Sequence, residues 1–211
     1  ERIYQAHSIA TIIYQQNKNL SEVEVTKLIT DALRSIRFND GRGYYFIYKT
    51  TGANIMHPVV PAMEGSSQWN FQDTRGNYIV RDMGNIAKKS GEGFYRWWFV
   101  KPQNKSKEFE KIGFGKHFAP YDWFIGTGEY VMDVENDIKS RLLKRINNIR
   151  YGINGYVFVV DYQGNILSHY SEKLVGTNRM ELRDQHGTSV VEEIVKTAKG
   201  GEDFLYYKGP L

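Results

Sequence analysis

The stretch that decides the fold is GYYFIYKTTGANIMH, residues 43–57, because the chain repeats its pattern as GYVFVVDYQGNILSH at residues 155–169. Each copy has an aromatic and β-branched run, a polar turn with a glycine, and a second apolar piece that ends on a histidine. That order is typical of a β-hairpin. Five residues recur at one constant spacing: Gly43 and Gly155, Tyr44 and Tyr156, Phe46 and Phe158, Gly52 and Gly164, and His57 and His169.

A second pair of matching segments follows in the same order. GGEDFLYY at residues 200–207 echoes SGEGFYRW at residues 90–97. Two matching pairs at nearly equal spacing predict a tandem repeat of one antiparallel αβ unit. The second copy stops at Leu211, where the first still has two strands to come, so we expect the second unit to be truncated.

Helices are predicted on either side of the first hairpin. Apolar residues three or four positions apart predict one broken helix or two helices within residues 1–38. Ser21 and Glu24 have the spacing of a capping box, and the run from Phe38 to Gly41 should end the helical region. Similar spacing predicts helices over 78–89 and 131–149, and Ser189 with Glu192 predicts another capped helix.

Strands complete the first unit. Residues 57–77 contain two prolines and two glycines without any period, which predicts a long irregular connection of the kind that often carries function. Aromatic and β-branched residues then predict strands over 94–101, 112–118 and 123–130.

The composition is that of a globular protein. The 211 residues are 41% hydrophobic and 25% charged, and no cysteine is present, which excludes disulfides and thiolate metal sites. The formal charge of +4 comes from 28 basic and 24 acidic residues dispersed along the chain, so we expect no nucleic-acid partner. No run approaches the roughly 18 apolar residues of a membrane span. The helical spacing of apolar residues is already present from Glu1 onward, which suggests that this sequence is a piece of a longer protein.

Enzyme motifs are absent from the sequence. The five histidines form no H-x-x-x-H pair, and the chain has neither a nucleophile elbow nor a phosphate-binding glycine loop. We therefore expect no catalytic residue, no metal and no cofactor.

The first copy resembles a known sensor family. In order, GYYFIY, HPVVP with Glu64-Gly65, GEGFYRWWFVKP, Lys111 and WFIGTGEYVMDV are similar to the motifs of the double Cache family of PAS-like extracytoplasmic sensors. The match covers about residues 43–134, whereas the second copy lacks both prolines of the HPxxP segment. The resemblance implies an α+β fold with a long N-terminal helix followed by two tandem PAS-like antiparallel sheet units.

The same resemblance implies a domain plan and a role. An N-terminal stalk helix region would cover 1–42, a membrane-distal unit 43–133, a linker helix 134–154, and an incomplete membrane-proximal unit 155–211. The parent protein would be a membrane-anchored bacterial or archaeal receptor, namely a histidine kinase, a diguanylate cyclase or a chemoreceptor. Its sensor region would be periplasmic and non-catalytic, and it could form a homodimer through the N-terminal helix.

Five residues are candidates for ligand contact. Strand alternation puts Tyr44 on one face with Phe46 and Tyr48, and Trp97 on one face with Tyr95 and Phe99. Each aromatic ring could equally fill a core, His57 could be a histidine bonded within a turn, and Lys111 could be one more solvated lysine. The family motif favours Tyr44, His57, Trp97 and Lys111, and Arg96 is a further candidate if its face is inward. Aromatic walls with one or two cations suit a small carboxylate.

A carbohydrate-binding module is the alternative function. Trp69, Trp97, Trp98 and Trp123 could serve as stacking platforms if they lay on the surface. Shielded tryptophans would favour the sensor.

Overall fold

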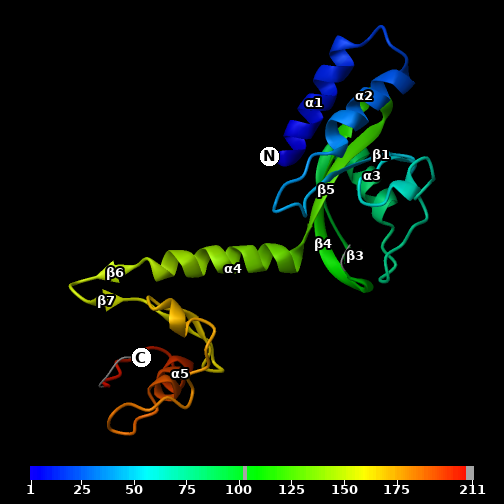
Figure 1. The fold of residues 1–211 in the computed structure, drawn as a ribbon. Helices are drawn as coiled ribbons and strands as arrows, with labels where there is room; N and C mark the ends of the chain where they lie inside the picture. Colours follow the sequence, from blue (N-terminus) through cyan, green and yellow to red (C-terminus); the bar gives the residue numbers. More distant parts are fainter. Residues whose placement is uncertain (102–103, 208–211) are drawn as a thin grey trace. The chain divides into compact units, whose positions relative to one another are not determined.

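The computed structural model describes residues 1–101 and 104–207, which form two compact units, residues 1–134 and residues 135–211. Figure 1 shows the elements of both units along the chain, and each unit is described separately below.

The first unit is built on a five-stranded antiparallel sheet with the order β2-β1-β5-β4-β3. Its strands are β1 (Tyr45–Lys49), β2 (Asn54–Met56), β3 (Glu92–Lys101), β4 (Asn104–Phe118) and β5 (Trp123–Tyr130). The predicted hairpin and the three later strands are therefore confirmed.

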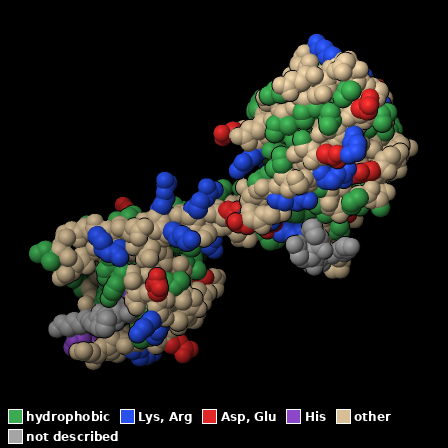
Figure 2. Space-filling model, turned by 45° about the horizontal axis from the view of Figure 1, so that its top comes forward, with side chains coloured by type: hydrophobic (Ala, Val, Ile, Leu, Met, Phe, Trp, Pro, Cys, Tyr) green, Lys and Arg blue, Asp and Glu red, His purple; other side chains and the backbone are tan. Residues whose placement is uncertain are grey.

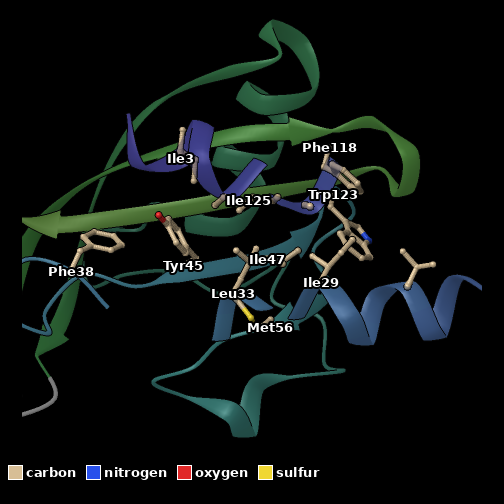
Figure 3. Close-up of a cluster of buried hydrophobic side chains, with 13 residues drawn as sticks. Ile3, Ile29, Leu33, Phe38, Tyr45, Ile47, Met56, Phe118, Trp123 and Ile125 are labelled. Atoms are coloured by element: carbon tan, nitrogen blue, oxygen red, sulfur yellow. The ribbon is translucent and has the colours of Figure 1, made fainter. Parts of the chain in front are cut away.

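Two helices cover one face of this sheet. They are α1 (Arg2–Gln16) and α2 (Glu22–Arg34), so the expected long N-terminal helix is two helices joined by a turn. The break follows from the capping box of Ser21 and Glu24, which is present at the start of α2 and fixes a new helix there. Figure 3 shows Ile29 and Leu33 of α2 packed with side chains from β1, β2 and β5.

The opposite face carries a second cluster of buried aromatic and aliphatic side chains. Helix α3 (Ile79–Ser90) lies over it, and the 57–78 connection with its short 3-10 helix η1 (Pro61–Met63) precedes α3. Strand alternation explains the division, because Tyr44, Phe46 and Tyr48 face α3 while Tyr45 and Ile47 face α1 and α2.

The second unit repeats the first up to its helix. Strands β8 (Val159–Val160) and β9 (Ile166–Ser168) pair as β1 and β2 do, with Val159 opposite Ser168 where Ile47 is opposite Met56. Both hairpins contain the same register shift. The 3-10 helix η3 (Glu172–Leu174) and α5 (Val190–Gly200) then follow in the positions of η1 and α3. The predicted tandem repeat is thus present in the structure.

Two expectations for the second unit are wrong in detail. Residues 155–160 form no single strand: β7 (Gly155–Tyr156) pairs with β6 (Arg150–Tyr151), and β8 pairs only with β9. In the first unit β1 lies between β2 and β5, and the described part of the second unit has no counterpart of β5. Ser189 precedes α5, but its side chain makes no capping hydrogen bond.

Helix α4 (Val131–Asn147) begins in the first unit and continues in the second. Within the described residues, no helix has the length and apolar character that crossing a membrane requires. Figure 2 shows acidic as well as basic side chains on the visible face, in keeping with a small net charge.

Candidate functional site

The first unit contains a small cavity of about 40 Å³ between the sheet and α3. Residues of β1, β3, β4 and β5 line the sheet side, α3 lines the opposite side, and Met63 and Phe71 of the 57–78 connection close it. The space exceeds the roughly 10–15 Å³ that one water needs, so it can hold a very small molecule. Its lining residues are Tyr44, Phe46, Tyr48, His57, Met63, Phe71, Ile79, Val80, Met83, Trp97, Phe99, Lys111 and Phe124.

Three neighbouring strands bring Trp97, Lys111 and Tyr130 into one row. Lys111 of β4 is paired with Trp97 of β3 on one side and with Tyr130 of β5 on the other. Directly opposed residues on adjacent strands project from the same face of a sheet. The lysine Nζ consequently lies 4.5 Å from the ring centroid of Tyr130 and 5.7 Å from that of Trp97.

Lys111 is a buried cation. Its side chain is 2% exposed, and its Nζ lies 3.4 Å from the hydroxyl oxygen of Tyr44. Burial lowers the pKa of Lys111 from 10.5 to about 8, an effect that the charge of Glu129 partly offsets. Within residues 1–101 and 104–207 it forms no ion pair with a carboxylate, so aromatic rings are its principal neighbours.

His57 is neutral and offers one hydrogen-bond donor. Its Nδ1 accepts the backbone N–H of Val60 at 3.0 Å, so the ring proton belongs on Nε2. Burial, followed by the charge of Lys111, lowers the pKa of His57 to about 4. The ring stacks on Phe46 with a centroid separation of 6.2 Å.

Glu64 holds His57 in place from outside the cavity. Its Oε1 accepts the backbone N–H of His57 at 2.8 Å, and both carboxylate oxygens accept hydrogen bonds from the guanidinium of Arg34 on α2. The pair with Arg34 lowers the pKa of Glu64. This arrangement gives a structural role to the glutamate that follows the HPVVP segment.

Asp73 ties the 57–78 connection to the sheet. Its carboxylate accepts the backbone N–H groups of Arg75 and Asn77 within the turn and that of Trp98 on β3, each at 2.9 Å. The guanidinium of Arg75 also lies 4.1 Å from the ring centroid of Trp98. The connection is therefore anchored beside the cavity.

Two glycines make room for Trp97. A Cβ atom at Gly113 or Gly128 would lie 2.4 Å or 2.8 Å from Cη2 of the indole, which is closer than non-bonded atoms approach. Gly128, the second glycine of the W-x-x-G-x-G-x-Y segment, thus allows the indole to approach the backbone of β5 closely.

The structure brings together four of the five predicted site residues: Tyr44, His57, Trp97 and Lys111 all line the cavity. Arg96 does not, because alternation along β3 points it to the other face, where it forms an ion pair with Glu110 at 2.9 Å. Sequence reasoning missed Tyr130, Met63 and Phe71. The position of Tyr130 beside Lys111 depends on the register of β4 and β5, which the sequence does not give, and no periodic signal marks the residues of the irregular connection.

Two of the four tryptophans are too deeply buried to be surface platforms. Trp97 is 4% exposed and Trp123 is fully buried, while Trp69 and Trp98 are half-buried. In the described part of the chain, no three His, Cys, Asp or Glu side chains are grouped so that they could hold a metal ion.

The chain is similar to parts of larger signalling proteins. It is 26% identical over 208 residues to the methyl-accepting chemotaxis protein McpP of Pseudomonas putida, covering 91% of this chain and 36% of that protein. It is 29% identical over 92 residues to the sensor histidine kinase MctS of Rhizobium johnstonii, covering 44% of this chain and 20% of that protein. The chain thus spans about a third or less of the curated relatives that it matches.

Two solved structures share the fold. A periplasmic sensor domain of a chemotaxis protein has a TM-score of 0.57 at 24% identity, covering 61% of this chain and 90% of that one. A Cache chemosensory domain described for carboxylic acid recognition has a TM-score of 0.57 at 22% identity, covering 61% and 88%. A family model for the Cache domain, in its double form, matches residues 1–211. The chain therefore belongs to the double Cache family of sensor domains.

Proposed function

We propose that this chain is the extracytoplasmic ligand-binding region of a membrane-anchored signalling receptor, and that its first unit binds a small organic carboxylate. The observation that carries the proposal is the buried charge of Lys111. A buried ion is stable only when it is paired, and a bound carboxylate would supply the partner that no described residue provides.

The rest of the cavity suits the same ligand. Its lining contains no Asp or Glu, and it offers N–H and O–H donors from Lys111, His57 and the tyrosines Tyr44 and Tyr48. The remaining walls are apolar and aromatic, as in most small-molecule sites. A volume of about 40 Å³ favours an acid of two or three carbons over a sugar or a long-chain acid.

The receptor context rests on the relatives. McpP is a chemotaxis protein and MctS a sensor histidine kinase, and the similar Cache chemosensory domain is described for carboxylic acid recognition. These relatives support a chemotaxis signalling domain or a histidine kinase as the output domain of the parent protein, and a diguanylate cyclase is proposed from the family resemblance alone. A homodimer through the N-terminal helices remains part of this proposal.

Isothermal titration calorimetry with acetate and propionate tests the ligand. Lys111→Ala should weaken binding by about 1.5–3 kcal/mol, the usual contribution of a hydrogen bond to a charged group, while the protein remains folded. Lys89→Ala, on the exposed side of α3, is the matched control and should bind as the wild type does.

Unchanged affinity in Lys111→Ala would refute the assignment of the anion to this cavity.

The carbohydrate alternative predicts that acrylamide quenches most of the tryptophan fluorescence. The burial of Trp97 and Trp123 favours weak quenching instead.

A further inference from the structure

The histidine of the second unit keeps the local contacts of His57. The Nδ1 of His169 accepts the backbone N–H of Ser171 at 3.0 Å, and its ring lies 5.2 Å and 6.2 Å from the rings of Tyr156 and Phe158. The side chain is 1% exposed, and burial lowers its pKa. His169 is consequently neutral near pH 7, with its proton on Nε2.

This Nε2–H is a buried donor without a partner. Among the residues that the structure describes, no acceptor lies within hydrogen-bond distance of it. Buried polar groups are nearly always satisfied by protein, ligand or water, so this donor needs a water or a ligand as its partner.

His169 borders a groove of about 570 Å³ within the second unit, between α4 and the β9–η3 segment. Lys139 and Lys144 of α4 supply two cations, and Glu172 of η3 supplies a carboxylate. Asn147 also lines the groove, and its Oδ1 is a buried acceptor that likewise has no partner in the described part of the chain. A hydrogen bond from Ser168 Oγ to the carbonyl of Leu143, at 3.2 Å, joins the two walls.

We propose that this groove is a second binding site, for a small carboxylate that bears a hydroxyl or ammonium group on the neighbouring carbon. The lysines and the His169 N–H recognise the carboxylate, whereas Asn147 Oδ1 and Glu172 accept the hydrogen bonds of the hydroxyl or ammonium group. The proposal is independent of the ligand in the first unit.

Histidine ring NMR of the whole chain tests the two sites separately. L-lactate, L-alanine and propionate share a three-carbon skeleton and differ only at the second carbon, so they are the probes. With five histidines, His169→Gln and His57→Gln assign the two resonances of interest. We expect lactate or alanine to shift the His169 Nε2 resonance and propionate to shift it far less.

Asn147→Leu should weaken that response at least tenfold and leave the His57 resonance at its wild-type position, which shows that the first unit is intact. The proposal is overturned if none of the three probes moves the His169 resonance, because water alone then satisfies Nε2. Equal responses to propionate and lactate would also overturn it. A response at His169 without one at His57 would instead contradict the proposed function of the first unit.

Discussion

Lys111 gives the first cavity a distinctive dependence on pH. Its folded-state pKa of about 8 lies below the ordinary 10.5, so the unfolded chain binds more protons between these two values. The free energy of unfolding without ligand should therefore rise with pH across this window. The affinity for a carboxylate should fall over the same window. If only the protonated form of Lys111 binds the carboxylate, the fall is about tenfold per pH unit.

Chemical denaturation and calorimetry between pH 7 and 10 measure both trends in the wild type and in Lys111→Met. The difference between the two proteins isolates the contribution of Lys111 to the pH dependence from that of the neighbouring tyrosines. If wild-type affinity stayed constant up to pH 10, the lysine would not be the anion's partner.

The indole of Trp97 depends on the missing side chain at Gly128. In Gly128→Ala the new Cβ would lie 2.8 Å from the indole, so the ring must move into the cavity or the strands must separate. Overpacking of this kind lowers the free energy of unfolding by about 1–3 kcal/mol, and ligand affinity should fall with it. Thermal unfolding and calorimetry measure the two effects.

Gly200→Ala is the control, since no atom lies within 4 Å of its added Cβ. A Gly128→Ala protein with wild-type stability and affinity would show that the tight contact has no influence on the cavity.

The candidate site was only partly predictable at the level of single residues. Alternation correctly grouped Tyr44 with Phe46 and Tyr48, and Trp97 with Tyr95 and Phe99, and the structure brings the two groups onto one face of the sheet. The same alternation placed Arg96 on the opposite face from Trp97, so the two could not both line one cavity. Lys111 follows a run of charged residues, and only the family motif separated it from them. Its orientation depends on the register of β4 against β3 and β5, which sequence spacing alone does not give.

The 57–78 connection is held over the cavity by Asp73. In Asp73→Ala the part-buried N–H groups of Trp98, Arg75 and Asn77 lose their acceptor, which costs about 1–3 kcal/mol of the free energy of unfolding. We expect ligand affinity to fall as well, because Phe71 would no longer be held over the cavity. Denaturation and calorimetry measure stability and affinity in the same protein.

Asp184→Ala is the matched control in the second unit. Asp184 accepts the N–H groups of His186 and Thr188 as Asp73 accepts those of Arg75 and Asn77. This variant should leave carboxylate binding in the first unit unchanged. Equal losses of affinity in both variants would mean that the connection acts through general stability and not as a cover for the cavity.

Hairpins and caps were predictable where the determinants are local. The Ser21 capping box and the paired hairpins need only neighbouring residues, and both are present. The single strand expected over residues 155–160 is divided into β7 and β8, because these pieces pair with different strands, β6 and β9. In the first unit β1 pairs along its whole length with β5, which comes from a distant part of the chain.

The tandem repeat was predictable for the whole molecule because two pairs of matching sequence segments follow in the same order. In the structure its two hairpins also share one register, including the shift between the paired residues. Both turns also use a positive-φ glycine, Gly52 or Gly164, packed against a residue of the following connection. The repeat therefore preserves how each connection folds back on its hairpin. The residue that packs on the glycine differs between the copies, since the counterpart of Trp69 is Met180.

Helix α4 begins at the residue after Tyr130, so the cavity is directly linked to the element that continues into the second unit. The Tyr130 ring contacts Lys111, and its hydroxyl donates to the carbonyl of Val100 at 2.6 Å. Asp133, in the first turn of α4, forms a 2.6 Å ion pair with Lys101 at the end of β3. A ligand that binds Lys111 would thus change the populations of the conformations that the first turn of α4 adopts.

Hydrogen exchange of the α4 amides, with and without propionate, measures this coupling. In the wild type we expect the ligand to change their protection. In Asp133→Asn the link to Lys101 is weakened, so the change should shrink while affinity stays near the wild-type value, because Asp133 does not line the cavity. Glu135→Gln removes a carboxylate two residues along the same helix and should retain the wild-type response. If the ligand left α4 exchange unchanged in the wild type, the signal would have to leave the first unit by another route.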